Sequence, residues 1–458
     1  MKNLLPLFLI VSILLAACGT NEPANVSTEP SGTVQETESA PTEETGVEAQ
    51  TQLEVDVEAL RGLEISVWTP WYGVEQALFE TFVNEFNASN EWGIKVSAQS
   101  QINFTNLYET TKASLPTEGR PNLVIALPEH AQEWFSNGVS TDLAEYVEDP
   151  LYGLDASDIP FAFWNQDLAG KARVAVPAQR TTQVLLWNET WADELNINAA
   201  PASADDFRKQ ACRAHDSMKK DEFAENDAMG GWIVDTEPMT AYAWMLSFNG
   251  GVLEEGNYRF LTPENIDTFK FLRELSESNC AWQGATDPVT SFANREALFI
   301  TASLQDLPIV TRAFASADNR DTWSVLPFPN ENDGTIAVYG SSYIVMKSTD
   351  EKQLAAWLFA RWLLDNEQDS RWVEATHNFP LRDSTQSLLG DYEKTHPQWK
   401  QAVDLIPEGE LQPPLGSWRT IKVMLGDGFA HMYRVNVPSG QVAAILAQME
   451  SMAKDLSQ

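Results

Sequence analysis

Two strand-like runs separated by a polar break, close to the last quarter of the chain, constrain the fold more than any other feature. Residues 336–338 and 343–346 are rich in β-branched and aromatic side chains, which favour strands. Between them, the Gly-Ser-Ser segment 340–342 lets the backbone bend. The pattern predicts a strand that crosses from one part of the protein to another. An amphipathic helix should follow, because apolar residues recur at helical spacing after a capping sequence at 348–351.

Alternating strand and helix patterns earlier in the chain predict an α/β protein. Residues 63–69 alternate like a strand, 74–86 carry the apolar face of a helix, and 94–98 form a second strand. The uninterrupted apolar run 123–127 is typical of a central parallel strand covered by helices on both faces. Such βαβ units build mostly parallel sheets flanked by helices. About 400 residues remain after the N-terminal region, enough for two lobes with separate cores.

The first 60 residues have the features of an exported and anchored protein. Residues 1–17 combine an early lysine, an apolar run and small residues, which is typical of a signal peptide and too short for a membrane span. The segment 15–18 (Leu-Ala-Ala-Cys) matches a bacterial lipobox, so we expect cleavage before Cys18 and lipid on its thiol. An ordinary signal peptide followed by a chance cysteine is the alternative. Residues 18–60 contain no lysine or arginine and are rich in Thr, Ser, Glu and Pro, which predicts a disordered tether.

The charge of the chain argues against one class of partner. Its 66 acidic and 30 basic residues give a formal net charge of -36. Only about ten of the acids lie in the predicted tether, so the folded part is acidic as well. Because this charge repels polyanions, we expect no nucleic-acid partner. It favours solubility at a cell surface, or life in salty surroundings.

The three cysteines suggest a disulfide and no metal centre. If Cys18 carries lipid, Cys212 and Cys280 remain, and an even number in an oxidising compartment favours a bridge over two buried thiols. They cannot build a four-ligand zinc site by themselves, since no Cys-x-x-Cys motif or histidine cluster lies nearby. We therefore expect neither a metal nor a cofactor.

Several segments together resemble the extracellular solute-binding proteins of bacterial ABC importers, in their maltodextrin-binding-protein-like group. The resemblance is clearest in the crossing segment 336–346, in the helix after it and in the Pro-Leu-Arg sequence at 380–382. The lead-in 115–122 to the apolar strand and the interrupted strand 173–188 are similar to further segments of the family. The chain departs from the family pattern at Asn122, where Asp is usual, and at Asn294-Arg295, where Gly-Lys is usual.

The resemblance implies a two-lobe periplasmic-binding-protein-like fold with hinge crossover strands between the lobes. Lobe 1 would comprise residues 61–180 and 343–388, and lobe 2 residues 181–342 and 389–458. A ligand would lie between the lobes, and its contacts with both would shift the protein from an open to a closed state.

Residues that follow the first-lobe strands are candidates for ligand contacts, because ligands of open α/β sheets bind beyond the carboxyl ends of the strands. Trp71 and Tyr72 follow the first strand, and Glu129 follows the strand that ends at residue 127. An aromatic ring can stack on a sugar, and a carboxylate can accept hydrogen bonds from its hydroxyls. For any one tryptophan, a place in the core is the alternative, since the chain has 16 of them.

The resemblance adds further candidates in the crossings and in the second lobe, namely Gln179, Arg180, Glu237, Asn249, Ser303, Gln305, Tyr339 and Ser341. Ordinary turn chemistry would explain Tyr339 and Ser341 equally well. A helix end would be a sufficient reason for the Gly-Gly pair at 250–251. Arg382 resembles a family residue, but pairing with an acid would also account for it.

Binding, not catalysis, is the expected function. The sequence has no Gly-x-Ser-x-Gly elbow, His-Glu-x-x-His motif, phosphate loop or dinucleotide glycine pattern. The resemblance implies a monomeric receptor, lipid-anchored on the extracytoplasmic face of the cell membrane, that passes a small solute to ABC permease subunits. Aromatic richness and acidic charge favour a sugar or oligosaccharide over an anion. The alternatives are an exported carbohydrate-active hydrolase, since paired carboxylates can cleave glycosides, and a sensing or adhesion lipoprotein of the same fold.

Overall fold

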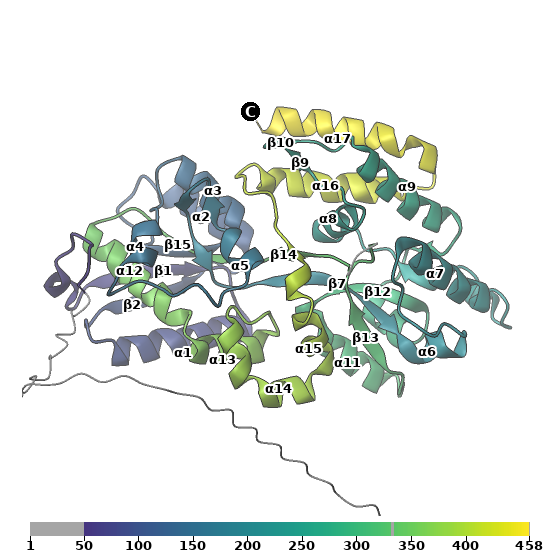
Figure 1. The fold of residues 1–458 in the computed structure, drawn as a ribbon, viewed down its shortest axis with the longest axis horizontal. Helices are drawn as coiled ribbons and strands as arrows, with labels where there is room; N and C mark the ends of the chain where they lie inside the picture. Colours follow the sequence, from purple (N-terminus) through teal and green to yellow (C-terminus); the bar gives the residue numbers. More distant parts are fainter. Residues whose placement is uncertain (1–49, 331–333, 458) are drawn as a thin grey trace, which may run out of the picture. The chain divides into compact units, whose positions relative to one another are not determined.

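The computed structural model describes residues 50–330 and 334–457, in which two large β-sheets are flanked by helices (Figure 1). The predicted signal peptide, Cys18 and residues 19–49 of the predicted tether lie outside this part. Within the described residues, no helix combines the length and the apolar character that a membrane crossing requires.

The first sheet has the strand order β2-β1-β3-β15-β6. Its strands are β1 (Glu64–Thr69), β2 (Lys95–Ser100), β3 (Leu123–Ala126), β6 (Val176–Pro177) and β15 (Ser342–Val345). β1 pairs in parallel with β2 and β3, whereas β15 runs antiparallel to β3 and β6. Four of its five strands therefore run in the same direction, as predicted, and only β15, which returns from the second sheet, runs in the opposite one.

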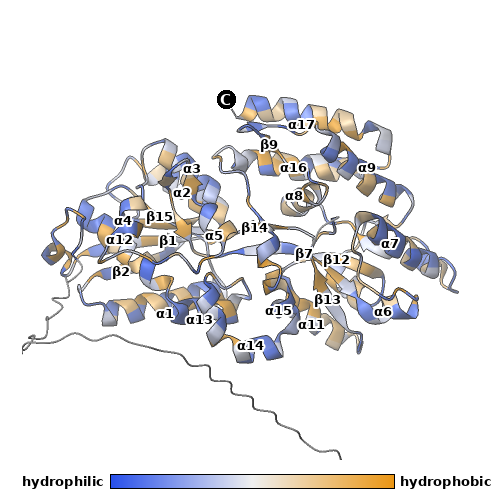
Figure 2. Ribbon diagram, viewed as in Figure 1, coloured by the Kyte–Doolittle hydropathy of each residue, from blue (hydrophilic) through white to orange (hydrophobic). Residues whose placement is uncertain are grey.

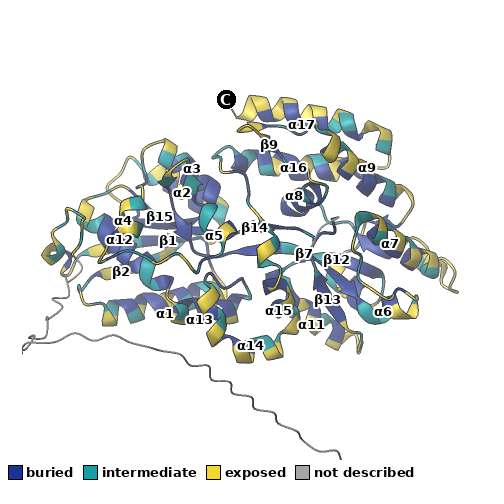
Figure 3. Ribbon diagram, in the orientation of Figure 1, coloured by how far each residue is buried: buried dark blue, intermediate teal, exposed yellow. Residues whose placement is uncertain are grey.

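Side chains of the first sheet alternate between two apolar layers, as strand geometry requires. Val67 and Ile125 lie in one layer, together with apolar residues of α1 and α12. Trp68 and Val124 lie in the other, together with residues of α2 and α3. Helices thus cover both faces, and the buried strands contrast with the exposed outer sides of the helices (Figure 3). The helices are α1 (Gly73–Ser89), α2 (Phe104–Ser114), α3 (Pro128–Ser136), α4 (Ala144–Glu148), α5 (Phe161–Asn165), α12 (Asp350–Leu363) and α13 (Asn366–Thr376).

The second sheet has the order β11-β8-β12-β7-β14-β16, and β13 also pairs with β7. It is mixed too: β8 pairs in parallel with β11 and β12, whereas β7 runs antiparallel to β12, β13 and β14. The strands are β7 (Thr181–Asn188), β8 (Gly230–Ile233), β11 (Ala281–Trp282), β12 (Ala297–Ser303), β13 (Trp323–Leu326), β14 (Ile336–Tyr339) and β16 (Gly409–Glu410).

Amphipathic helices pack on the second sheet, and their apolar and polar sides are distinct in Figure 2. One sheet face packs with residues of α7, α8, α9, α16 and α17. α15 packs against β13, so the chain has returned to the second sheet after Arg382. The helices of this half are α6 (Glu189–Glu194), α7 (Ala204–Met218), α8 (Pro238–Ser247), α9 (Pro263–Glu277), α10 (Pro288–Ala293), α11 (Leu307–Ser316), α14 (Gly390–Thr395), α15 (Pro397–Val403), α16 (Trp418–Met432) and α17 (Val442–Leu456). Two hairpins complete the strands: β4 (Leu168–Ala169) with β5 (Ala172–Arg173), and β9 (Leu253–Glu254) with β10 (Asn257–Tyr258).

Two short connections join the sheets. β6 leads through residues 178–180 into β7, and β14 leads through residues 340–341 into β15. The crossing residues Val176, Val184 and Val338 belong to a single apolar cluster that includes residues of both sheets. The expectation of fully separate cores is therefore wrong, because the crossing strands are themselves apolar and connect the first core to one face of the second sheet.

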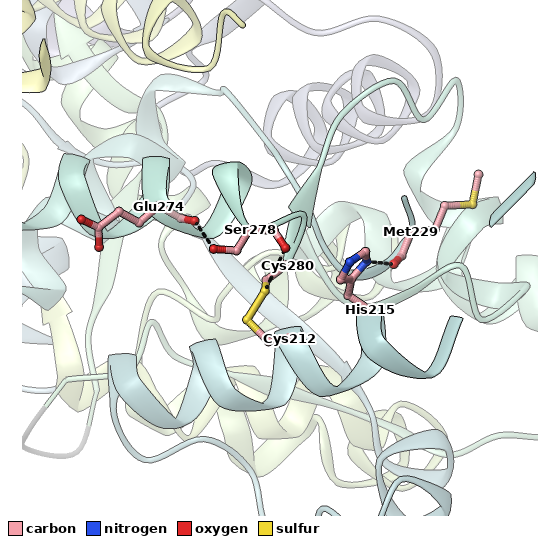
Figure 4. The surroundings of a disulfide bond; sticks show 6 residues. All are labelled: Cys212, His215, Met229, Glu274, Ser278 and Cys280. Atoms are coloured by element: carbon pink, nitrogen blue, oxygen red, sulfur yellow. Dashed lines mark hydrogen bonds between the residues drawn. A yellow bond between two sulfur atoms is a disulfide. The ribbon is translucent and has the colours of Figure 1, made fainter. Parts of the chain in front are cut away.

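Cys212 and Cys280, the pair that the sequence favours as a bridge, are joined by a disulfide (Figure 4). Cys212 lies in α7, and Cys280 lies directly before β11. The bond therefore ties a helix that covers the second sheet to the edge of that sheet.

The predicted tether ends earlier than residue 60. The Thr51 hydroxyl and the Gln52 N–H both donate to Asp149, at 2.8 and 2.7 Å. A short 3-10 helix follows at Val57–Leu60, and Leu60 is fully buried. Residues 50–60 are ordered because their alternating apolar side chains pack on the first core, a pattern that the low overall hydrophobicity of the tether conceals.

Candidate functional site

Gly340 brings the two crossings into direct contact. Its φ is +145°, and a Cβ atom at this position would lie 2.0 Å from the carbonyl oxygen of Gln179. Only glycine permits such an approach. The N–H groups of Ala178 and Gln179 both donate to the carbonyl of Ser341, at 2.9 and 3.0 Å. The two crossings therefore form one hydrogen-bonded unit.

Arg180 is fully buried under the crossings and is held by an ion pair. Its Nη2 lies 2.6 Å from Oδ2 of Asp167, and its Nη1 donates to the Ser341 carbonyl at 2.6 Å. The Ser342 hydroxyl donates to the other Asp167 oxygen at 2.6 Å. The structure thus places Arg180, which was expected to contact ligand, where it supports the backbone of both crossings.

Trp71 and Gln179 form the first-sheet side of the site. Trp71 is only 4% exposed and packs on Trp372 at a ring-centroid distance of 4.4 Å. Its Nε1 donates to Oε1 of Gln179 at 3.4 Å, and the Ser341 hydroxyl donates to the same oxygen at 3.4 Å. Trp71 therefore positions Gln179 from within the core. The neighbouring Tyr72 is 69% exposed and is the ring available for stacking.

Carboxylates gather around Tyr339 on the second sheet. The Gln183 amide donates to the Tyr339 hydroxyl at 3.1 Å. Burial raises the pKa of Tyr339, and the negative charges of Asp306, Asp235 and Glu237 raise it further. Burial also raises the pKa of Asp235, which accepts from the Glu237 N–H at 3.1 Å. This side of the site is rich in hydrogen-bond acceptors.

Ser303 and Gln305 lie where β12 ends and the chain turns towards α11. The side chain of Ser303 forms a capping box with Asp306. Gln305 is exposed, and its Nε2 donates to Oε1 of Glu75 at 3.5 Å. Burial raises the pKa of Glu75, although a hydrogen bond with Gln179 opposes the shift. The Gln305–Glu75 contact connects the second half of the protein to α1 of the first.

Glu129 and Lys422 form another contact between the halves. Glu129, in the first turn of α3, is 2% exposed, and Nζ of Lys422 on α16 lies 2.6 Å from its Oε1. Burial by itself raises the pKa of Glu129, but the charges of Lys422 and His130 and its hydrogen bonds outweigh burial and lower it. One turn earlier on α16, the guanidinium of Arg419 lies over the Tyr108 ring, 4.3 Å from its centroid.

Asn249 lies apart from the other candidates. It is exposed beyond the C-terminal end of α8, whereas Glu237 precedes the N-terminal end. About 15 Å of helix separates the two positions. Asn249, not one of the glycines after it, adopts the left-handed conformation, with φ of +59°. Gly250 is needed for space, since a Cβ there would lie 2.3 Å from Oδ1 of Asn265.

The structure brings most of the remaining candidates together around the crossings. Direct hydrogen bonds link Trp71, Gln179 and Ser341, and Tyr339 shares its environment with Glu237. Sequence reasoning missed several residues of the same region: Glu75, Asp167, Asp235, Asp306, Arg419 and Lys422. Glu75 could have been found, because it stands in the first turn of the helix that follows Trp71 and Tyr72.

The chemistry of the region suits a neutral, hydroxyl-rich ligand. It combines an exposed aromatic ring with amide, hydroxyl and carboxylate acceptors. Two basic side chains of the region, Arg180 and Lys422, are already paired with Asp167 and Glu129.

The protein consists of two mixed α/β halves that crossing strands join, and polar side chains of both halves lie beside the crossings. This arrangement is the two-lobe fold of periplasmic binding proteins. The chain belongs to the bacterial extracellular solute-binding protein family, whose model matches residues 81–406. The prediction of this family and of its fold is confirmed. The family consists of binding proteins, and its description places it outside the cytoplasm.

Solved structures of sugar-binding proteins share the fold. The cyclic α-maltosyl-1,6-maltose binding protein of Arthrobacter globiformis matches with a TM-score of 0.72 and 17% identity, over 85% of this chain and 98% of that one. The sugar-binding protein MalE of Xanthomonas citri matches with a TM-score of 0.74 and 16% identity, over 86% and 97%.

A third match is UgpB of Mycobacterium tuberculosis in complex with glycerophosphocholine, with a TM-score of 0.70 and 16% identity over 86% and 98% of the two chains. Identities this low establish a common fold and nothing finer. No curated protein matches the sequence.

Proposed function

We propose that this protein is an extracytoplasmic receptor that binds a sugar or oligosaccharide and delivers it to the permease subunits of an ABC importer. The cluster beside the crossings carries the proposal: Tyr72 offers a stacking surface, and Gln179, Tyr339 and Glu237 offer hydrogen-bonding groups from both halves. The proteins named above from A. globiformis and X. citri bind sugars, which agrees with this chemistry.

The receptor works by hinge closure. Lobe 1 comprises residues 61–180 and 343–388, and lobe 2 comprises 181–342 and 389–458. The hydrogen-bonded unit around Gly340 and Gln179 lets the crossings bend together. A solute that contacts both lobes binds the closed state more tightly than the open state. The difference in binding free energy between the two states sets how far the solute shifts the protein towards closure. Addition of ligand should therefore reduce the radius of gyration of the monomeric protein in small-angle scattering.

Calorimetry of the full chain against a panel of sugars tests the ligand class. Maltose, maltotriose and cyclic oligosaccharides represent the proposed class, and glycerol 3-phosphate represents an anion. We expect saturable binding of at least one sugar and none of glycerol 3-phosphate, because the negative charges of Asp306, Asp235 and Glu237 act on the Tyr339 side of the site. Flat titrations with every mono- and oligosaccharide would remove the carbohydrate assignment and leave the fold unaffected.

A matched pair of variants localises the binding. Glu237→Gln removes an exposed carboxylate that precedes α8, and Glu264→Gln removes an exposed carboxylate in the first turn of α9. We expect Glu237→Gln to weaken sugar binding about tenfold, because charge-assisted hydrogen bonds are lost, and Glu264→Gln to leave it unchanged. Equal effects of the two substitutions would place the sugar elsewhere.

The membrane anchor is a lipid on Cys18. In the Cys18→Ala variant the protein should leave the membrane fraction, while sugar affinity stays the same. Incubation of the sugar with purified protein should yield no cleaved product, since the receptor binds without turnover. Release of shorter saccharides would instead support the hydrolase alternative.

A further inference from the structure

A small cavity of about 290 Å³ lies between α11 and the segment that leads from α13 to α15. Its floor is apolar, with Leu307 and Pro308 at the start of α11 and Trp399 on α15. Its polar lining consists of Thr311, Arg312, His377, Thr395, His396 and Gln398. None of the candidate sugar contacts lines it.

The charge of this cavity is opposite to that of the protein. Acids outnumber bases by 66 to 30 in the chain, yet the lining contains one arginine and two histidines and no carboxylate. Arg312 is exposed, and no described residue forms an ion pair or hydrogen bond with its guanidinium. Arg312 and His377 both line the cavity. Burial is the main cause of the lowered pKa of His377, and the charges of His396 and Arg312 lower it further.

His377 is held in place by its neighbours. It ends α13 in the left-handed conformation, with φ of +62°, and its N–H donates to the Val373 carbonyl. Its Nδ1 is hydrogen-bonded to the Tyr392 hydroxyl, and Trp399 Nε1 donates to its carbonyl at 3.0 Å. A phenol is the better donor, so Tyr392 donates to Nδ1 and the neutral ring carries its proton on Nε2. His377 can therefore donate to an acceptor without being charged.

We propose that this cavity binds a small carboxylate with an apolar body. Arg312 supplies a planar fork that matches a carboxylate, and His377, which lines the same cavity, supplies a neutral donor. Leu307, Pro308 and Trp399 accept the apolar body. A volume of about 290 Å³ suits a one-ring or short-chain acid.

Benzoate is the probe, because it combines a carboxylate with one apolar ring. Calorimetry of the full chain at pH 7 should show saturable benzoate binding, weaker binding of the uncharged benzamide by about tenfold or more, and no measurable binding of inorganic phosphate. Absence of saturable heat with benzoate, equal affinity for benzamide, or equal affinity for phosphate would each overturn the assignment.

Two arginines on the same part of the chain provide a matched pair of variants. Arg312→Gln should weaken benzoate binding at least tenfold, and Arg312→Lys, which keeps the charge but loses the fork, should lie between it and the native protein. Arg320→Gln removes a charge from an exposed arginine that does not line the cavity and should leave affinity unchanged. An equal loss in Arg312→Gln and Arg320→Gln would mean that net charge, and not this cavity, attracts the anion. Sugar binding should be the same in all of these variants.

Discussion

Nζ of Lys422 lies 2.6 Å from Oε1 of Glu129, which joins α16 of the second half to α3 of the first. The two residues are 293 positions apart, and the carboxylate is almost completely buried. A buried charge without a partner is costly, because it has lost its contact with water. The ammonium group of Lys422 therefore stabilises the charged form of Glu129. The pair therefore holds the two halves together in this arrangement.

Loss of Lys422 should destabilise the protein more than loss of the pair. We expect Lys422→Met to lower the free energy of unfolding by roughly 3 kcal/mol, since Glu129 stays buried without a partner. Adding Glu129→Gln should recover part of the loss, and urea denaturation of the single and double variants measures both effects. Because the pKa of Glu129 is lowered in the folded state, the contribution of the pair is present above the ordinary carboxyl pKa and is lost as pH falls through the folded value. A single variant as stable as the native protein would show that Glu129 is solvated.

Arg180 should be essential for stability, although it carries no ligand-binding role in the structure. Both it and Asp167 have fully buried side chains. Arg180→Met should lower the free energy of unfolding by about 3 to 5 kcal/mol, because Asp167 loses its only described ion-pair partner. The control is Arg208→Met: Arg208 pairs with Asp205 on the exposed side of α7, where solvent screens the attraction, so little change is expected. Thermal unfolding of the two variants compares the two pairs.

Gly340→Ala should distort the crossings. The added Cβ would meet the Gln179 carbonyl at 2.0 Å, at a φ of +145° that L-residues rarely adopt. We expect a loss of roughly 2 kcal/mol in unfolding free energy and weaker solute binding, since the crossings must separate. Gly251→Ala is the control, because nothing lies within 4 Å of its Cβ position. Unchanged affinity in Gly340→Ala would show that the site does not depend on the contact between the crossings.

Asp369 should make stability fall as pH rises through the weakly acidic range. Burial raises the pKa of this carboxyl from its ordinary 3.8 to about 6, despite hydrogen bonds from Thr385 and the Leu381 N–H. Between these two values the folded state binds more protons than the unfolded state, so the contribution of Asp369 is most favourable near pH 4 and is lost above pH 6. Asp369→Asn should abolish this component, because both donors bind the same oxygen and an amide oxygen can replace it. Urea denaturation at several pH values between 4 and 7 tests the difference; identical profiles would mean that folding does not raise the pKa of Asp369.

Local patterns were sufficient for the parts of the fold that local forces build. The helix predicted after the capping sequence at 348–351 begins at Asp350, and Thr349 accepts a hydrogen bond from its first turn. The interrupted strand at 336–346 separates into β14 and β15, one in each sheet. The end of the tether was missed because its ordering depends on Asp149, which lies about a hundred positions away.

Side-chain roles at the site were harder to predict for the same reason. Arg180 and Trp71 belong to segments that reach the site, but both side chains are buried. Arg180 pairs with Asp167, and Trp71 donates a hydrogen bond to Gln179. A pattern of residue types reveals which segment reaches the site and does not reveal which way each side chain points.

The amino-acid sequence by itself determined the family, the α/β class and the positions of the crossings, since these depend on periodicity and on short motifs that are read along the chain. Only the tertiary structure decided which charges are paired, which aromatic rings remain exposed and where the two halves touch. Those properties arise from contacts between residues tens to hundreds of positions apart, and burial, which only the folded chain creates, sets the energy of each.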